Sequence, residues 1–442
     1  MKEFFEFLYK LISGMLPFSL LIVCGLFITL KNGFFQFSKF GSAVKLLMKA
    51  FRYTKKRNKG VSSYQAACTA LSGTVGTGNI IGVAGALVYG GAGAVFWMWI
   101  SAFLGMAIKY TEISLSVKYR ESSIDGYVGG PMYYITNGLG NKFKKLSLIF
   151  SVLLIPAVIC TGNITQTNSA VLFITHSTSL KITVGVVLAL LVSLVVFGGS
   201  ERICAFTEKI VPLMSVMYVA LCLGIIIKNY NVIPQAFLNI FKGAFLPRSV
   251  TGGAVGGALS CFITGASRGV FSNEAGLGTS AMAHSIAVDA KEESQGLYGL
   301  LEVFIDTILI CTLTALTILC SGVNIEYGKT MATQLVGTAF SVVYGKTAGI
   351  LLSVMMLIFA FSSIVGWGLY GKLGSEFLFG KRGSKIFLLL YPLICIFGAV
   401  CEEKFAWQLS EFFNGCLLCI NLPVLLLLHQ NLRGAISVRN KN

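Results

Sequence analysis

Apolar runs of about 20 residues recur from one end of this 442-residue chain to the other, and no other feature constrains its fold as strongly. A helix of that length crosses a bilayer core of roughly 30 Å. Helices close their own backbone hydrogen bonds, whereas an unpaired amide in hydrocarbon costs several kcal/mol, so we interpret the runs as helices. Charged residues make up 12% of the chain, about half the share usual in soluble domains. The sequence therefore predicts an all-α polytopic membrane protein.

We expect eleven transmembrane helices. The stretch 330–344 is moderately apolar but too short to cross a bilayer, so we expect a helix lying on the membrane surface there. The expected spans are 11–30, 64–90, 94–117, 146–172, 181–198, 209–227, 252–283, 297–320, 347–371, 385–400 and 408–428.

The net charge of +17 comes mainly from basic residues in the connections between the apolar runs. If the connection 31–63 lies in the cytoplasm, that side holds 24 of the 35 Lys and Arg residues and the other side holds 9. This bias follows the positive-inside rule and gives no reason to expect a nucleic-acid partner. The sequence predicts a multi-pass protein surrounded by the lipid of the cell (plasma) membrane. Its amino terminus is expected outside and its carboxyl terminus in the cytoplasm.

The second expected span has three glycines within Gly73–Gly78. Each glycine costs about 1 kcal/mol in a helix interior. Polar groups are interspersed or adjacent, on Thr74, Thr77 and Asn79. We interpret the cluster as a break in the helix. The alternative is close packing of neighbouring helices, which we favour for Gly85, Gly90, Gly91, Gly93 and Gly105.

The seventh expected span is equally rich in glycine and places Arg268, Asn273 and Glu274 in an apolar stretch. It lies five spans after the second, the relation expected for interrupted helices in inverted-repeat transporters. Such breaks free N–H groups that suit a carboxylate and carbonyl groups that suit a hard cation. The glycines of this span are Gly252, Gly253, Gly256, Gly257, Gly265, Gly269, Gly276 and Gly278.

Three long motifs resemble the alanine/glycine–cation symporter family, also called the sodium:alanine symporter family. They are Gly90–Gly105 (GGAGAVFWMWISAFLG), Gly129–Ile135 (GGPMYYI) and Arg268–Gly276 (RGVFSNEAG). The resemblance runs from about residue 60 to about residue 430. It implies a leucine-transporter-type fold, in which two inverted five-helix repeats each contain one discontinuous helix.

The resemblance also implies a division of the chain. Residues 1–60 would form an extra N-terminal transmembrane helix and a basic cytoplasmic loop. Residues 61–430 would form the ten-helix transporter core, with a first repeat at about 61–230 and a second at about 231–430. Residues 431–442 would be a cytoplasmic tail.

Part of the substrate site implied by the resemblance lies at the first break. The backbone N–H groups of Thr77, Gly78 and Asn79 would bind the carboxylate of an amino acid. Gln166, on the fourth expected span, would add a further donor to that carboxylate.

The rest of the implied substrate site comes from the seventh and ninth spans. Phe271 and Asn273 are expected to follow the second break, where Phe271 would wall a small pocket and Asn273 would reach polar groups of the substrate. Ser363 and Trp367 lie at i and i+4 on one helix face. Ser363 would meet the substrate ammonium group, and Trp367 would limit the volume of its side chain.

The resemblance places a sodium ion between the second and ninth spans. Its expected ligands are the carbonyl groups of Ser72, Val75 and Phe359 and the hydroxyl groups of Ser362 and Ser363. Sodium prefers such hard oxygen ligands. For each serine the alternative is a hydrogen bond to its own i−4 carbonyl.

Charged residues inside spans are candidates for function. Lys109 and Glu112 are spaced i, i+3 and could neutralise each other. Glu302 and Asp306 are spaced i, i+4 and could line a proton or cation path, or pair with Arg268 or another buried donor.

The function that these features favour is secondary active transport: sodium-coupled symport of small neutral amino acids, alanine and glycine, by alternating access. Sodium is the expected coupling ion, and no other cofactor is expected. A proton-coupled amino-acid symporter is the first alternative and an ion channel the second. An enzyme is disfavoured, because the chain has three dispersed histidines and no H-E-x-x-H motif.

Overall fold

The computed structural model of the chain describes residues 9, 11–52, 60–123, 126–246, 257–329 and 331–432. Three glycines of the seventh expected span (Gly252, Gly253 and Gly256) and all but the first two residues of the expected tail 431–442 lie outside the described residues.

Helices make up nearly all of the described structure. The α-helices are α2 (Leu16–Lys31), α3 (Phe35–Arg52), α4 (Ser63–Thr74), α5 (Val83–Gly90), α6 (Gly93–Lys118), α7 (Pro131–Leu139), α8 (Lys144–Ile159), α9 (Thr165–Ile174), α10 (Thr178–Val196), α11 (Gly199–Lys228), α12 (Ile233–Phe245), α14 (Ala258–Asn273), α15 (Thr279–Ser285), α16 (Glu292–Val303), α17 (Thr312–Cys320), α18 (Ala332–Tyr344), α19 (Ala348–Leu390), α20 (Ile394–Val400) and α21 (Glu403–Leu428). Wider π-helical turns join several of them: η1 (Leu11–Met15), η2 (Gly78–Gly82), η4 (Cys160–Ile164) and η6 (Phe304–Cys311). The 3₁₀ turns are η3 (Asn141–Phe143), η5 (Tyr230–Val232), η7 (Gly345–Thr347), η8 (Tyr391–Leu393) and η9 (His429–Leu432).

The prediction of an all-α polytopic membrane protein is confirmed. Within the described residues, eight helices are long and apolar enough to cross a membrane, or nine if the bent pair Ser63–Thr74 and Gly78–Gly90 is one span. A count of eleven also needs α14 with α15 to form one span, and Ala332–Val400 to be divided at Gly380, whose backbone is non-helical (φ 68°, ψ −170°). The number eleven therefore stays a prediction.

Lipid explains why several helices expose apolar side chains. On α10 seven aliphatic residues are exposed, although a soluble protein would bury most of such a helix. They are Leu180, Ile182, Val186, Val187, Leu190, Leu191 and Leu194. The opposite side of α10 packs on α11, α19 and α20.

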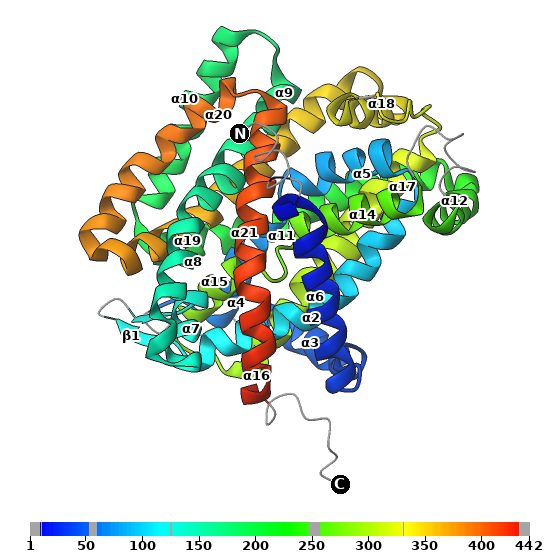
Figure 1. The fold of residues 1–442 in the computed structure, drawn as a ribbon. Helices are drawn as coiled ribbons and strands as arrows, with labels where there is room; N and C mark the ends of the chain where they lie inside the picture. Colours follow the sequence, from blue (N-terminus) through cyan, green and yellow to red (C-terminus); the bar gives the residue numbers. More distant parts are fainter. Residues whose placement is uncertain are drawn as a thin grey trace.

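The two interrupted helices pack crosswise at the centre of the molecule. The first consists of α4 and α5, and the second of α14 and α15. α14 packs against α5, and α15 packs against α4, so each half contacts the opposite half of the other helix. In Figure 1, α5 and α14 lie in the upper half of the view and α4 and α15 in the lower half. The two breaks therefore lie near the middle of the bundle.

The connections contain more regular structure than the sequence indicated. Residues 35–52 of the basic connection form the amphipathic helix α3, which packs on α16 and carries the Lys39–Glu293 ion pair (2.5 Å). α12 and the short antiparallel strands β1 (Glu121–Ser123) and β2 (Gly126–Val128) were not predicted. The expected connection at 372–384 is helical except at Gly380. The surface helix expected at 330–344 corresponds to α18, which has 13 residues.

Candidate functional site

The structure confirms the break in the second expected span. α4 ends at Thr74, Val75 has an extended backbone (φ −77°, ψ 92°), and helical structure resumes at Gly78. The axes of the two halves differ by 49°. Val75 and Thr77 are fully buried. The non-helical segment is thus surrounded by protein, as irregular backbone at membrane depth must be.

Crowding around the break explains why residue 76 is a glycine. A Cβ atom on Gly76 would lie 2.5 Å from Ser363 Oγ and 2.9 Å from Gln166 Oε1. The Gly76 N–H donates to Asn79 Oδ1 (2.9 Å). Glycine therefore lets polar side chains of α9 and α19 reach the backbone of the break.

Gln166 lies at the position that the sequence assigned to it, beside the break. Its Oε1 accepts hydrogen bonds from the Thr77 N–H (3.1 Å) and the Thr77 hydroxyl (2.8 Å). Its Nε2 donates to the Thr161 carbonyl (3.3 Å). The Asn79 N–H, another expected carboxylate donor, bonds to the Gly76 carbonyl (3.2 Å). In this conformation, two of the three expected N–H donors are held by acceptors of the protein itself.

Two of the five expected sodium ligands, the Ser363 hydroxyl and the Val75 carbonyl, meet between α4 and α19. The Ser363 hydroxyl donates to the Val75 carbonyl (3.5 Å), and the neighbouring Ser362 Oγ is buried without a hydrogen-bond partner among the described residues. Ser72 Oγ donates to the Thr69 carbonyl (2.7 Å). A hydroxyl at a non-helical carbonyl, an orphaned hydroxyl on the adjacent residue, and neither thiol nor amine among the five expected ligands fit a hard cation such as sodium. Phe359, one turn before Ser363, is fully buried.

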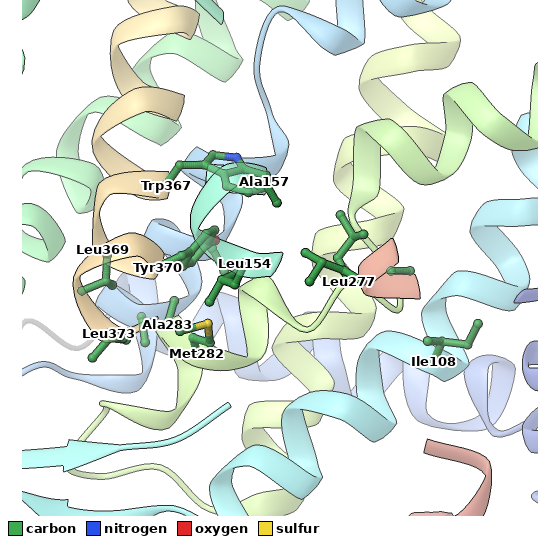
Figure 2. Close-up of a cluster of buried hydrophobic side chains, with 14 of the residues drawn as sticks. Ile108, Leu154, Ala157, Leu277, Met282, Ala283, Trp367, Leu369, Tyr370 and Leu373 are labelled. Carbon is green, nitrogen blue, oxygen red and sulfur yellow. The ribbon is translucent and has the colours of Figure 1, made fainter. Parts of the chain in front are cut away.

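Trp367 braces the break from α19. Its indole N–H donates to the Gly73 carbonyl (3.2 Å), and a Cβ atom on Gly162 would collide with its ring. Figure 2 shows Trp367 and Tyr370 on the same helix, in one buried cluster with Ala157 and Leu154 of α8. A large, fully buried ring therefore lies directly against the end of the first half-helix.

The second interrupted helix is confirmed, but the predicted position of its break is wrong. Phe271 and Asn273 were expected after the break, whereas both lie in the last turn of α14, before it. The break comprises residues 274–278. It begins with Glu274 in the left-handed region (φ 55°, ψ 21°) and ends with Gly278 (φ 81°).

Two different uses of glycine explain this error. At Gly265 and Gly269 a Cβ atom would collide with α6, so these glycines permit close helix packing. At Gly276 (φ 88°) and Gly278 the backbone requires positive φ, which glycine adopts without strain. The sequence alone does not distinguish glycines that permit close helix packing from glycines that adopt positive φ.

Asn79 links the two breaks through a carboxylate. Its Nδ2 donates to Ser272 Oγ (2.9 Å) on α14 and to Asp306 Oδ1 (2.6 Å) on η6. Asp306 also accepts from the Ser272 hydroxyl (2.6 Å) and the Thr307 hydroxyl (2.8 Å). All four side chains are buried. Because Asn79 Oδ1 holds the Gly76 N–H, this network fixes both the first break and the end of α14.

The side-chain amide and the carbonyl group of Asn273 are hydrogen-bonded within the protein. Its Nδ2 donates to Thr307 Oγ1 (3.1 Å), and its Oδ1 accepts from the Ala275 N–H (3.0 Å). Its carbonyl accepts from Lys109 Nζ (2.9 Å), and a cation is favourable at a helix C-terminus. Lys109 also lies 3.9 Å from Glu112, which confirms the expected pair. Ser272, and not Asn273, contacts the first break.

Phe271 begins an aromatic stack that covers one side of the first break. A Cβ atom on Gly78 would lie 3.4 Å from the Phe271 ring. The Phe271 and Trp407 rings are 4.7 Å apart, and the Arg268 guanidinium lies 4.7 Å from the Trp407 ring. Arg268 pairs with Glu411 (3.2 Å). Arg268 therefore does not pair with Glu302 or Asp306. The other branch of that alternative is confirmed, because Asp306 accepts from other buried donors and Glu302 contacts His284.

The sequence indicated most of the side chains that lie against the first break. It did not indicate the hydrogen bonds that link the two breaks. Gln166, Ser363 and Trp367 lie against the first break, and Phe271 lies beside Gly78. The contacts of Ser272 and Asp306 with Asn79 were not foreseen. Asp306 could be recognised in the sequence as a candidate, because it is a carboxylate inside an expected span. A serine in a helix gives no such indication.

Comparisons with known proteins agree with this geometry. A family model described as "Sodium:alanine symporter family" matches residues 1–439. The "Sodium/alanine symporter AgcS" of Methanococcus maripaludis is 36% identical over 416 residues, which cover 92% of this chain and 90% of that protein.

Two relatives from Bacillus subtilis match at similar length. The "Amino-acid carrier protein AlsT" is 36% identical over 439 residues, covering 97% of this chain and 90% of the relative. The "Probable sodium/glutamine symporter GlnT" is 31% identical over 437 residues, covering 97% of this chain and 89% of the relative.

Proposed function

This chain belongs to the sodium:alanine symporter family, and from that premise we propose that it couples the uptake of small neutral amino acids, alanine and glycine, to the entry of sodium. Members of the family are transporters and not enzymes. The proposal concerns which solutes this chain carries and which residues bind them.

One observation carries the proposal: the carboxamide of Gln166 and the hydroxyl of Ser363 both reach the buried, non-helical segment Val75–Thr77. Unwound backbone offers N–H groups to a carboxylate and carbonyl groups to a cation within a few ångströms. A zwitterion and a sodium ion are the solutes that need both.

The proposed sodium ligands are the carbonyl groups of Ser72, Val75 and Phe359 and the hydroxyl groups of Ser362 and Ser363. The unpartnered Ser362 Oγ supports this set, because a buried hydroxyl without a partner costs about 1–3 kcal/mol unless a ligand satisfies it. Sodium is the coupling ion named for the family.

The proposed substrate carboxylate binds the N–H groups of Thr77, Gly78 and Asn79. Substrate would displace Gln166 Oε1 from the Thr77 N–H, and Gln166 would turn its Nε2 to the carboxylate. Ser363 would meet the ammonium group.

The proposed substrate site is closed by bulky and polar neighbours. Trp367 and Phe271 would bound the space for the substrate side chain and favour small substrates. In this proposal Asn273 does not bond to the substrate, because its amide group is already hydrogen-bonded to Thr307 and Ala275. The glutamine named for GlnT makes glutamine the larger substrate to compare.

The proposed cycle is alternating access across the plasma membrane, with the amino terminus outside and the carboxyl terminus in the cytoplasm. The Phe271–Trp407 stack would close the outer side of the site. A cysteine added at the carboxyl terminus should be shielded from a membrane-impermeant reagent in intact cells. Labelling from outside would reverse the orientation.

Uptake by purified protein in liposomes tests the function. With sodium outside, we expect labelled alanine or glycine to accumulate above the outside concentration, and glutamine to compete weakly. Replacing outer sodium by potassium or choline should abolish accumulation. Accumulation that follows a proton gradient and ignores sodium would establish the proton-coupled alternative. Movement that never exceeds equilibrium would indicate a channel.

A further inference from the structure

A buried histidine on the second half of the second interrupted helix has no part in the site proposed above. His284 is on α15 and is fully buried. Its Nε2 contacts Glu302 Oε1 on α16, and its Nδ1 lies 2.6 Å from Gln295 Nε2 at the start of the same helix. A histidine so enclosed has a protonation state fixed by its hydrogen-bond partners.

The donors and acceptors around His284 determine its protonation state. Gln295 Nε2 also contacts the Ser63 carbonyl (3.2 Å), which can only accept, so the NH₂ group of Gln295 must face both Ser63 and His284. His284 Nδ1 must then accept, which leaves its proton on Nε2, facing Glu302. His284 is therefore neutral in this arrangement.

Two buried atoms without partners point to a second possible arrangement of the hydrogen bonds around His284. Among the described residues, Gln295 Oε1 and Glu302 Oε2 are buried without a hydrogen-bond partner. If Nδ1 gained a proton, it would need an acceptor, and Gln295 Oε1 is adjacent. The carboxamide would have to rotate to present Oε1, and its NH₂ group would leave the Ser63 carbonyl. Glu302 would carry the charge that balances the imidazolium.

The contact that would be lost joins α16 to the first turn of α4, the first half of the broken helix. Two neighbouring contacts hold the same turn. Ser63 N–H donates to Asp289 Oδ1 (2.7 Å), and the Val288 N–H donates to the Val61 carbonyl (2.9 Å). Losing one of these three ties would loosen the end of α4.

A cavity lies near this region. It is lined by residues that flank both partners of the contact, with Val61 and Gly60 before Ser63 and Ile286 and Val288 after His284. Lys372 and Glu376 of α19 also line it. Water in this cavity would lie within a few residues of the histidine.

Other charged groups near the pair do not contact the imidazole. Lys109 bonds to Ser280 (2.6 Å), one turn before His284, and opposes a second positive charge there. Besides His284 and Glu302 themselves, the titratable and charged groups around the pair are Tyr64 and Cys68 on α4, Lys109 and Glu112 on α6, Glu274 before α15, Asp289 after it, Tyr298 on α16, Tyr370 on α19, and Arg120, which bonds to the Ser285 carbonyl.

We propose that His284 is a proton-binding site whose occupancy turns Gln295 away from Ser63 and releases the first turn of α4 from α16. The proton site stands on this geometry alone. Its consequence for transport, easier opening of the side of the molecule on which Ser63 lies, rests on the proposed function.

Hydrogen–deuterium exchange of the purified full chain tests the proposal without any transport assay. Amide exchange in a peptide covering Ser62–Ala70 is followed between about pH 5 and pH 8, where histidine titrates, and corrected for intrinsic exchange rates. As pH falls, we expect protection to decrease about fivefold, the effect of one lost hydrogen bond. Protection that is constant with pH in the unmodified protein would overturn the proposal, whatever the variants do.

Variants separate the proton site from general destabilisation. His284→Gln should make protection independent of pH. Glu302→Gln should move the transition to lower pH, because the imidazolium loses its counter-charge. Gln295→Met should keep α4 in the released state at every pH. A pH response that survives in His284→Gln would also overturn the proposal.

Two further histidines provide matched controls. His176 is exposed between α9 and α10, and His429 is buried at the end of α21. His176→Gln and His429→Gln should keep the pH response of the unmodified protein, and loss of the response in either would overturn the assignment to His284. Sodium-driven uptake is measured separately. Absent uptake with an intact pH response would refute the proposed function and leave the proton site standing.

Discussion

Gly76 and Gly85 lie in the same interrupted helix but have different surroundings. A Cβ atom on Gly76 would collide with Ser363 and Gln166, whereas no atom of the described residues outside the helix's own backbone lies within 4 Å of a Cβ atom on Gly85. The close-packing role expected for Gly85 is therefore wrong. We expect Gly76→Ala to weaken sodium-dependent alanine binding about tenfold or more, since overpacking costs about 1–3 kcal/mol. Calorimetric titration measures the effect.

Gly85→Ala is the control for that variant. Alanine is a better helix former than glycine, so binding should be unchanged and the melting temperature should hold or rise. Equal alanine affinity in both variants would remove residue 76 from the site.

Trp367 tests how the side-chain volume of the substrate is limited. Trp367→Phe keeps a flat ring but shortens it and removes the N–H that bonds to the Gly73 carbonyl. We expect larger amino acids such as glutamine to compete better with labelled alanine. Trp99→Phe is the control, because it removes the same kind of N–H, which in Trp99 bonds to Thr312 Oγ1 (2.7 Å) and not to the backbone of the break. If Trp367→Phe leaves the selectivity series unchanged, Trp367 does not border the substrate.

At the scale of elements, Asp306 ties the two interrupted helices together through Asn79 and Ser272. Asp306→Ala would remove the carboxylate that accepts from Asn79, Ser272 and Thr307. Although Asn79 would keep Ser272 Oγ as an acceptor, the two hydroxyls would lose theirs, at a cost of about 1–3 kcal/mol. We expect a lower melting temperature together with loss of alanine binding.

Asp306→Asn keeps the shape of the side chain and removes its charge. Its Oδ1 can still accept from Asn79, and its NH₂ group can donate to the hydroxyls of Ser272 and Thr307, which accept equally well. We expect most of the stability to return. An Asp306→Ala variant as stable and as competent in alanine binding as the unmodified chain would show that the two breaks do not depend on this link.

Elements differ in how well the sequence specified them. The break at Gly73–Gly78 was predictable, because clustered glycines and polar residues in an apolar run have one economical explanation. The second break was placed too early, because the packing glycines Gly265 and Gly269 cannot be told from Gly276 and Gly278, which need positive φ. α3 and α12 are amphipathic, and α12 with 13 residues is also too short to span, so hydropathy did not reveal them.

For the whole molecule, hydropathy determined the fold class because a chain in lipid has few ways to satisfy its backbone. Motifs indicated the family, and the family indicated which residues would face each other. The partners of buried charges could not be predicted in the same way. Arg268 pairs with Glu411, and Glu302 contacts His284, and both pairs join elements that come together only in the folded bundle.

The central claim is that one break binds sodium and an amino acid side by side, so that each raises the affinity for the other. Reciprocal linkage makes this measurable in equilibrium binding, without a membrane. The most direct measurement is the Kd of alanine for the purified protein over a series of sodium concentrations at constant ionic strength, repeated for Ser362→Ala. We expect the Kd to fall as sodium replaces potassium and this dependence to weaken in the variant. An alanine Kd that is the same in sodium and in potassium would contradict the claim.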